Sequence, residues 1–350
     1  MERPRSALQI SYEQTLGASA ATDVRSREER MDVLVQADRL RKTFGPIIAV
    51  DEISLAVRRG EVLGFLGPNG AGKSTTMKML TGFLEPDCGS ARICGIDMGE
   101  QPKQAKAQIG YLPEGAPAYG EMTPWTFLRF IASVRGFDGP ANDAKVALAV
   151  ERTGLKSVLD QRIDTLSKGF KRRVGLAQAI LHDPPVLIMD EPTDGLDPNQ
   201  KHHVRQLISE MAKNKAIIVS THILEEVEAV CTRAVVIDRG RIVADGTAEE
   251  LQRRMPYHNA VALKVAANDA ETVAAALSTL SGVQDVEHLP AANGHVQLRA
   301  IPRRGSAIAA DVAGLIRQRS LPVTELFIER GKLDDVFRQI TTEERPAHHA

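Results

Sequence analysis

The fold of this chain is decided by Gly67-Pro68-Asn69-Gly70-Ala71-Gly72-Lys73-Ser74. The stretch matches the phosphate-binding pattern G-x-x-x-x-G-K-[ST] and stands between an expected strand at 61–66 and an expected helix at 73–80, as the pattern requires. Its glycines let backbone N–H groups close around phosphate oxygens, and the amino end of the helix adds favourable dipole charge. The segment predicts a site for ATP or GTP.

Two side chains of this loop have expected roles of their own. Lys73 can reach the β- and γ-phosphates, and the Ser74 hydroxyl can hold Mg²⁺. Thr75, the next residue, completes the expected phosphate-binding segment.

A second motif, Val186-Leu187-Ile188-Met189-Asp190-Glu191, places two carboxylates at the end of an apolar strand. Strands that are apolar throughout favour a parallel sheet covered on both faces, and ligands bind outside the carboxyl ends of such strands. Asp190 is therefore predicted to bind Mg²⁺ through its water shell, and Glu191 to polarise the attacking water. A solvated strand terminus is the alternative, but buried acid pairs without a cation are costly.

Composition limits the classes of protein to consider. The chain has 350 residues, 25% of them charged, and a formal net charge of -1 from 44 basic and 45 acidic side chains. This balance gives no electrostatic footprint for nucleic acid, so no nucleic-acid partner is expected. No run approaches the roughly 18 apolar residues of a membrane span, and no apolar stretch follows Arg3 and Arg5 as a secretory signal would require. Cys88, Cys94 and Cys231 are expected to be reduced thiols.

The pattern of apolar residues divides the chain into three parts. Residues 1–30 lack periodicity and are expected to be a flexible extension. Residues 31–254 predict an α/β domain with a parallel core sheet. Residues 255–345 predict a small α+β domain, because strands expected at 260–265, 283–288, 295–300 and 322–328 alternate with helices at 270–279 and 307–319. That order, β-α-β-β-α-β, is the ferredoxin-like split unit.

Further motifs complete an ordered set. Leu166-Ser167-Lys168-Gly169-Phe170 lies before the acidic strand, while Asp194-Gly195-Leu196-Asp197 and Ser220-Thr221-His222 follow it. Together with the phosphate loop, the set resembles the ABC ATPase family over about residues 33–254, with its phosphate loop, Q-loop, signature, acidic strand, D-loop and switch histidine.

The resemblance implies a nucleotide-sandwich homodimer, or a dimer with a related subunit, in which each chain completes the other's ATP site. Ser167, Gly169 and Asp197 would serve the partner's ATP, with the expected helix at 169–181 pointing at the γ-phosphate. His222 would sense that phosphate and act in catalysis with Glu191 and Lys73. Phe44 would stack on adenine, joining Gly67, Pro68, Asn69, Gly70, Ala71, Gly72, Lys73, Ser74 and Thr75 as ATP-binding residues.

Several of these residues also have ordinary structural interpretations. Phe44 could be a core residue, and Asp197 could be a helix cap as well as a D-loop residue. His202 and His203 are expected to be solvated. The basic run at 171–173 could suggest nucleic acid, but it is interpreted as a solvated helix face.

The sequence departs from the family pattern in two places. Lys168 and Phe170 replace the third and fifth residues of Leu-Ser-Gly-Gly-Gln. In Ile109-Gly110-Tyr111-Leu112-Pro113-Glu114, Glu114 stands where the Q-loop has glutamine. Its carboxylate can still ligate Mg²⁺, which prefers oxygen, so Ser74, Glu114 and Asp190 are the expected metal ligands.

Together with Asp194-Gly195-Leu196-Asp197-Pro198-Asn199-Gln200 and His222-Ile223-Leu224-Glu225-Glu226-Val227, these variants resemble drug, gliding-motility and multicopper-system ATPases. Leu333-Asp334-Asp335-Val336-Phe337 is similar to their C-terminal motif. The resemblance implies an ATPase on the inner face of the plasma membrane that powers a separate permease, as an exporter. The C-terminal domain would regulate it, form dimer contacts or sense a ligand. A soluble ABC ATPase acting on ribosomes or DNA, and a scaffold that binds ATP without turnover, are the alternatives.

Overall fold

The computed structural model describes residues 32–116, 118–221, 223–253, 257–290, 294–303 and 306–329. The chain divides into two compact units, Met1–Ile242 and Val243–Ala350. The expected boundary after residue 254 stays a prediction. His222, the motif at 333–337 and the extension at 1–30 lie outside the described residues.

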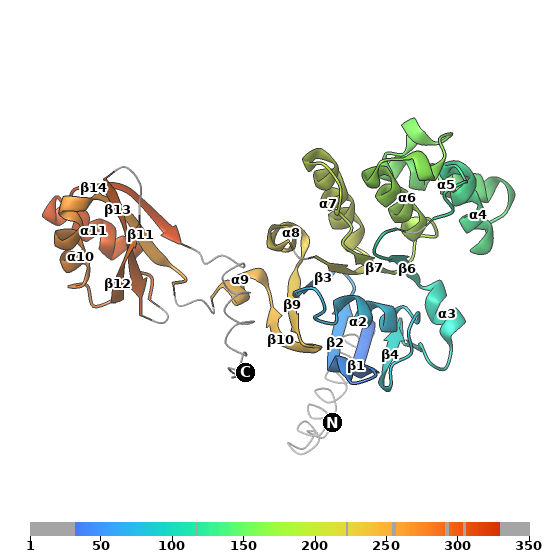
Figure 1. Ribbon diagram of the computed structural model, residues 1–350, viewed down its shortest axis with the longest axis horizontal. Helices are drawn as coiled ribbons and strands as arrows, with labels where there is room; N and C mark the ends of the chain where they lie inside the picture. Colours follow the sequence, from blue (N-terminus) through green and yellow to red (C-terminus); the bar gives the residue numbers. More distant parts are fainter. Residues whose placement is uncertain are drawn as a thin grey trace, which may run out of the picture. The chain divides into compact units, whose positions relative to one another are not determined.

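The first unit contains a mixed set of strands and helices (Figure 1). Its strands are β1 (Val33–Phe44), β2 (Ile47–Arg58), β3 (Val62–Leu66), β4 (Cys88–Ile93), β5 (Ile96–Asp97), β6 (Ile109–Leu112), β7 (Val186–Asp190), β8 (Ala216–Ser220) and β9 (Arg233–Asp238), with β10 (Arg241–Gly246) at its end. Its helices are α2 (Lys73–Leu80), α3 (Pro102–Ala107), α4 (Pro124–Val134), α5 (Gly139–Thr153), α6 (Lys168–Ile180), α7 (Pro198–Ala212) and α8 (Leu224–Val230).

These strands form two sheets. The larger has the order β10-β9-β3-β8-β7-β6, and its pairs β3–β8, β3–β9, β6–β7 and β7–β8 are parallel. The predicted parallel core sheet is thus confirmed. The smaller sheet, β2-β1-β4-β5, is antiparallel and was not predicted, because β4 (Cys-Gly-Ser-Ala-Arg-Ile) has too few apolar residues to show a strand pattern.

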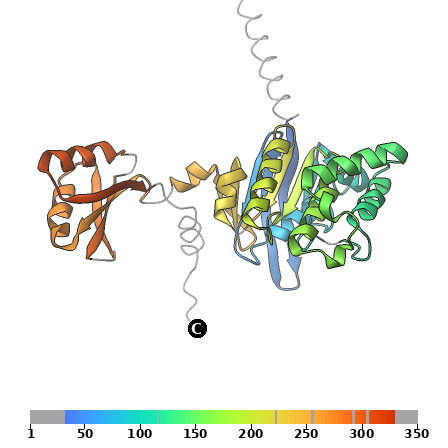
Figure 2. The same ribbon diagram turned by 90° about the horizontal axis from the view of Figure 1, so that it is seen from above.

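The parallel sheet is buried on both faces, which explains why β7 is apolar throughout. Val186 and Ile188 pack into a core shared with β1, β2 and α2, whereas Leu187 and Met189 pack into a second core with α4, α5, α6 and α7. In Figure 2 the blue strands of the smaller sheet and the green helices α4, α5 and α6 gather in separate parts of the first unit. Two apolar layers therefore fix the ends of the parallel strands, where the site lies.

The second unit has a different construction. It contains α9 (Ala248–Gln252), β11 (Ala260–Ala266), α10 (Ala270–Leu277), β12 (Val283–Pro290), β13 (His295–Pro302), α11 (Ala309–Arg319) and β14 (Val323–Glu329). The strands pair antiparallel in the order β12-β13-β11-β14, and both α10 and α11 contribute to the one apolar core on the sheet. From β11 onward the observed order of elements is the predicted β-α-β-β-α-β.

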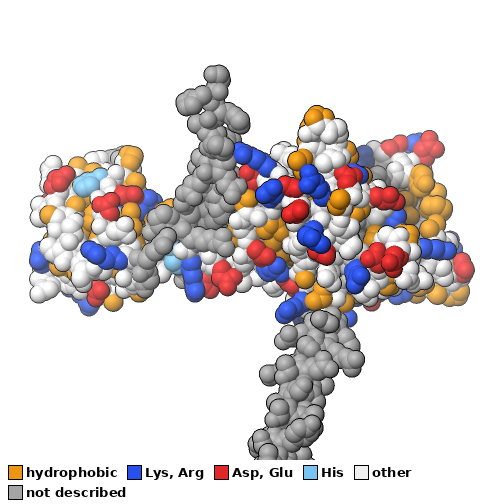
Figure 3. Space-filling view, turned by 90° about the horizontal axis from the view of Figure 1, so that it is seen from below, with side chains coloured by type: hydrophobic (Ala, Val, Ile, Leu, Met, Phe, Trp, Pro, Cys, Tyr) orange, Lys and Arg blue, Asp and Glu red, His pale blue; other side chains and the backbone are white. Residues whose placement is uncertain are grey.

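The surface carries both signs of charge. On the face drawn in Figure 3, basic and acidic side chains are interspersed rather than gathered into a patch of one sign. Within the described ranges, none of the helices has the length and apolar character needed to cross a membrane. All three cysteines are free thiols.

Candidate nucleotide-binding site

The phosphate loop connects β3 to α2 and closes on itself. Gly72 has φ +106°, and a Cβ there would lie 2.4 Å from the carbonyl oxygen of Ala49. Both the backbone conformation and the lack of space therefore exclude a side chain at this position. Lys73 is 7% exposed, and its Nζ donates hydrogen bonds to the carbonyl oxygens of Gly67 (2.7 Å) and Pro68 (3.0 Å). Ser74 and Thr75 follow, half-buried, in the first turn of α2.

The charged side chains of the site interact through Lys73. Burial lowers the pKa of Lys73, and the negative charges of Glu191, Asp190 and Glu114 oppose that shift. The three carboxylates follow β6 and β7, and Lys73 follows the parallel strand β3, so all four lie at the carboxyl edge of one sheet. The structure therefore brings together four residues that the sequence predicted separately.

The two carboxylates after β7 are tied to the next strand by Ser220. Asp190 is 3% exposed and accepts a hydrogen bond from Ser220 Oγ. The backbone N–H of Glu191 donates to Ser220 Oγ and to the Ser220 carbonyl oxygen, at 3.1 Å in both cases. Together with Ser74, these two carboxylates offer oxygen ligands, which suit a Mg²⁺ ion bound partly through nucleotide phosphates. A bound ion would neutralise phosphate charge.

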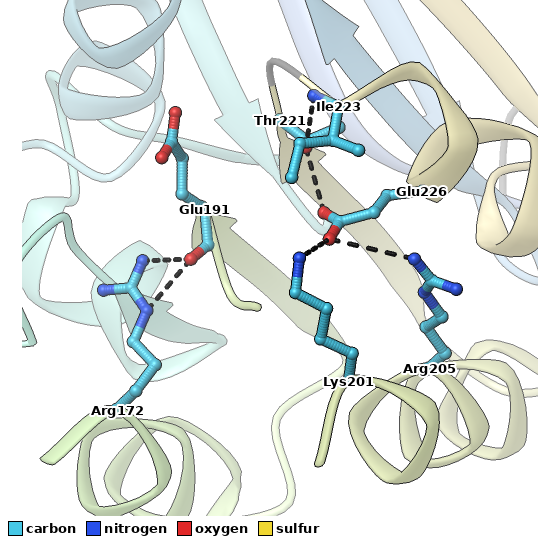
Figure 4. A network of polar contacts seen from close by, with 7 residues as sticks. All are labelled: Arg172, Glu191, Lys201, Arg205, Thr221, Ile223 and Glu226. Atoms are coloured by element: carbon cyan, nitrogen blue, oxygen red, sulfur yellow. Dashed lines mark hydrogen bonds and ion pairs between the residues drawn. The ribbon is translucent and has the colours of Figure 1, made fainter. Parts of the chain in front are cut away.

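Glu191 has an unusual backbone conformation. Its φ is +49°, in the left-handed region, which costs a residue with a side chain roughly 1–3 kcal/mol unless its surroundings hold it there. The guanidinium of Arg172 supplies part of that hold, because Nε donates to the Glu191 carbonyl oxygen at 3.0 Å (Figure 4). Nη2 donates to the carbonyl oxygens of both Asp190 and Glu191.

The prediction that the basic run 171–173 is a solvated face is wrong for its middle residue. Arg172 is only 5% exposed, because it lies on the buried stripe of α6 that also contains Gly169 and Leu176, at helical spacings of three and four residues. Lys171 and Arg173 are half-buried, and they donate hydrogen bonds to the carbonyl oxygens of Asp164 and Gly154, respectively. The run is thus a set of backbone contacts rather than a charged face.

The amino end of α6 packs against the loop before α7. Ser167 is the N-cap of α6, and its Oγ accepts a hydrogen bond from Phe170 N at 3.3 Å. A Cβ on Gly169 would lie 2.8 Å from Gln200 Oε1. Lys168, one of the variant signature residues, pairs with Asp194 at 2.8 Å.

Asp197 caps α7, as the structural interpretation predicted, with Oδ1 accepting from Gln200 N at 2.9 Å. His202 and His203 are exposed on α7, as expected for solvated residues. The contacts of Ser167, Gly169 and Asp197 with a partner's nucleotide stay predictions.

A buried acid that the sequence analysis missed links Thr221, directly after β8, to α7. Glu226 on α8 is 5% exposed; its Oε2 accepts from Thr221 Oγ1 (3.0 Å) and its Oε1 from Lys201 Nζ (3.3 Å) on α7. Arg205 adds an ion pair at 3.9 Å, and Ile223 N donates to Thr221 Oγ1 at 3.0 Å (Figure 4). Its place four residues after His222 was the available signal, but sequence spacing does not show which face of a short helix is buried.

The remaining predicted residues lie on exposed segments. Phe44, at the end of β1, is 49% exposed, so the alternative that it is a core residue is wrong, and Lys42 Nζ lies 6.0 Å from its ring centroid. Glu114 is exposed in the turn after β6, and its charge acts on Lys73, Tyr111 and Arg172. Adenine stacking by Phe44 and metal ligation by Glu114 stay predictions.

Comparison with known proteins gives the same family in sequence and structure. The ABC transporter family model matches residues 50–194. The chain is 39% identical over 222 residues to the probable multidrug ABC transporter ATP-binding protein YbhF of Escherichia coli, a match that covers 63% of this chain but only 38% of YbhF. It is 34% identical over 254 residues to the linearmycin resistance ATP-binding protein LnrL of Bacillus subtilis, covering 72% of this chain and 81% of LnrL.

Among solved structures, an ATP-binding subunit of an ABC transporter superimposes with a TM-score of 0.59 at 32% sequence identity. That match covers 63% of this chain and 92% of the other.

Proposed function

The chain belongs to the family of ABC transporter ATP-binding proteins, which are ABC ATPases, and on this premise we propose that it hydrolyses ATP to power export through a separate membrane permease. One observation carries the enzymatic part of the proposal. Lys73, Asp190 and Glu191 interact electrostatically at the edge of one parallel sheet. One bound nucleotide could therefore meet Lys73 as a cation for its phosphates, Asp190 as a ligand for Mg²⁺ and Glu191 as a base for the attacking water.

In the proposed reaction, the residues of this chain bind the nucleotide and orient water. The phosphate loop binds the phosphates through its backbone and Lys73, and Phe44 stacks on the base. Asp190, Ser74 and Glu114 would hold Mg²⁺, and Glu191 takes the proton of the attacking water. His222 contacts the γ-phosphate.

The proposed active form is a dimer that closes on two ATP molecules. Ser167 caps α6, so the amino end of this helix carries N–H groups and dipole charge suited to a phosphate. The packing of Gly169 against Gln200 places α6 beside the loop that contains Asp197. In our proposal both segments contact the nucleotide bound by the partner subunit.

The proposed membrane partner is supported by the relatives and by exposed aromatic side chains. The names of YbhF and LnrL include multidrug transport and linearmycin resistance, which favours export. Phe83 is 73% and Tyr119 59% exposed; Phe83 packs on Tyr111 and Tyr119 on Phe130. These rings lie on both sides of the Glu114 turn in the sequence, where uncovered aromatic surface suits a protein partner.

We also propose that the subunit lies at the cytoplasmic face of the membrane and that residues 255–345 form an accessory domain with a regulatory or dimer-contact role. Every nucleotide motif precedes this segment.

Replacing the proposed base tests the function. Glu191→Gln should lower ATP turnover by about 10²–10⁴-fold, the range for a positioned base, and should trap an ATP-bound dimer that gel filtration detects. Glu210→Gln, an exposed acid on α7, is the matched control and should leave turnover unchanged. Near-normal turnover of Glu191→Gln would refute the assignment.

A further inference from the structure

Arg172 joins two loops of the nucleotide site through one buried guanidinium. Its Nη1 donates to the carbonyl oxygen of Pro113 at 3.0 Å, and its Nε donates to that of Glu191 at 3.0 Å. We propose, on the basis of the proposed function, that Arg172 is a positioning residue that holds Glu191 in its reactive backbone conformation and fixes the Glu114 turn beside it.

The hold on Glu191 acts from both sides of the residue. Ser220 binds its N–H, and Arg172 binds its carbonyl oxygen. A residue at φ +49° keeps that conformation only while neighbouring groups hold it. The carbonyl oxygen of Glu191 also accepts from the backbone N–H of Asp194, at 3.1 Å. Without the guanidinium, this turn contact holds the peptide after Glu191 without the help of Arg172, so the orientation of that peptide relaxes and the carboxylate of Glu191 changes direction with it.

The same guanidinium fixes a second carboxylate. Pro113 directly precedes Glu114, so the bond to its carbonyl oxygen sets where the turn begins. Because its hydrogen bonds go to Pro113, directly after β6, and to Asp190 and Glu191, where β7 ends, Arg172 defines the spacing between the two loops. It also fixes the position of α6, the helix capped by Ser167, relative to both loops.

The geometry and the charge of the Arg172 side chain can be tested separately. Asp194, Asp190, Glu191 and Glu114 all act electrostatically on Arg172, so a lysine at 172 preserves the positive charge among them. A lysine, however, has no planar fork and cannot bind both loops as arginine does. Arg172→Lys therefore tests positioning, and Arg172→Met removes charge and positioning together.

ATP binding should be spared because, within the described residues, the hydrogen bonds of Arg172 go to Pro113, Asp190 and Glu191 and none goes to the phosphate loop. The lysine of that loop is held by Gly67 and Pro68. We expect Arg172→Lys to lower kcat about 10–100-fold, as displacement of a catalytic group by about 1 Å does. The Kd for Mg-ATP should change less than about twofold. The control is Arg135→Lys, an arginine that binds the carbonyl oxygens of Lys106 and Ile109 at the other end of β6; its kcat should equal that of the wild type.

A double-mutant cycle with Glu191→Gln gives the decisive measurement. If Arg172 acts mainly through Glu191, Arg172→Lys should lower the residual turnover of Glu191→Gln by a much smaller factor than it lowers that of the wild type. An equal fold-loss in both backgrounds would overturn the proposal, as would a parallel loss of ATP binding in the single variant. Unfolding of Arg172→Lys, measured by the emission of Trp125, would also overturn it by making Arg172 a folding residue.

These results are distinguishable from failure of the proposed function. If the wild-type chain, with or without a permease, shows no ATP turnover, the function is refuted. If Glu191→Gln is impaired while Arg172→Lys behaves as the wild type, only the role of Arg172 is refuted.

Discussion

The two units differ in what they bury. The first unit buries charged and polar side chains next to its apolar cores, including Lys73, Arg172, Asp190, Ser220 and Glu226. In the second unit, every buried side chain among residues 243–253, 257–290, 294–303 and 306–329 is apolar. Its charged networks, such as Arg299 with Glu287 and Glu329, remain partly exposed.

This difference indicates where the chemistry lies. Burying a charge is unfavourable unless it is paired or hydrogen-bonded. A cluster of buried charges at one sheet edge is therefore typical of a functional site rather than of a purely stabilising core. The second unit follows the ordinary rules of a stable sheet covered by two helices. Replacing a charged side chain should therefore have large effects in the first unit, where some of these side chains are buried, and small ones in the second, where they are partly or fully exposed.

The largest expected effect comes from the phosphate loop. Lys73→Ala should abolish ATP turnover, whereas Lys264→Ala, which removes an exposed ion pair with Glu325 in the second unit, should leave it unchanged. Ser167→Arg should also abolish turnover, by blocking the proposed contact with the partner's ATP. Steady-state ATPase assays on the purified chains measure both.

Mixing the two inactive variants tests whether the site is shared. A dimer of one Lys73→Ala chain and one Ser167→Arg chain retains one intact composite site, so the mixture should regain part of the turnover. Absence of recovery under conditions where dimers form would contradict a site completed in trans.

A smaller effect is expected from the buried acid of α8. Glu226→Gln removes its ion pair with Lys201 and should lower the free energy of unfolding by about 1–3 kcal/mol, the cost of disturbing a buried polar group. Glu329→Gln, at the partly exposed pair with Arg299, should cost the second unit about 0–1 kcal/mol.

Urea unfolding followed at Trp125 reports on the first unit, because Trp125 is the only tryptophan and packs against its core. Only Glu226→Gln should shift this transition. An equal shift with Glu329→Gln would show that the two units unfold together.

The smallest expected effect concerns Glu114. If its carboxylate reaches the metal, Glu114→Gln should raise the Mg²⁺ concentration for half-maximal turnover by about fivefold, since a unit charge about 4 Å away in water is worth about 1 kcal/mol. The same change should tighten ATP binding in the presence of a chelator. An unaltered Mg²⁺ curve in the isolated subunit would assign Glu114 to permease contacts instead.

Much of the fold could be predicted because its patterns are local. The helix at Lys73–Leu80 has the predicted bounds, and the strand predicted at 61–66 begins one residue later, at Val62. In the second unit the predicted order of strands and helices is the observed one. The antiparallel sheet of the first unit could not be predicted from β4, whose residues pack mainly through partners on β1 and show little periodicity of their own.

The sequence by itself determined the phosphate loop, the acidic strand, the family and the order of the motifs, because each depends on residues adjacent in the chain. Only the tertiary structure decided which polar residues are buried. Arg172 was interpreted as solvated and Glu226 was overlooked, yet both lie inside contact networks. Burial depends on which face of a helix meets residues distant in sequence, such as Pro113 for Arg172, and nothing in the local spacing encodes that meeting.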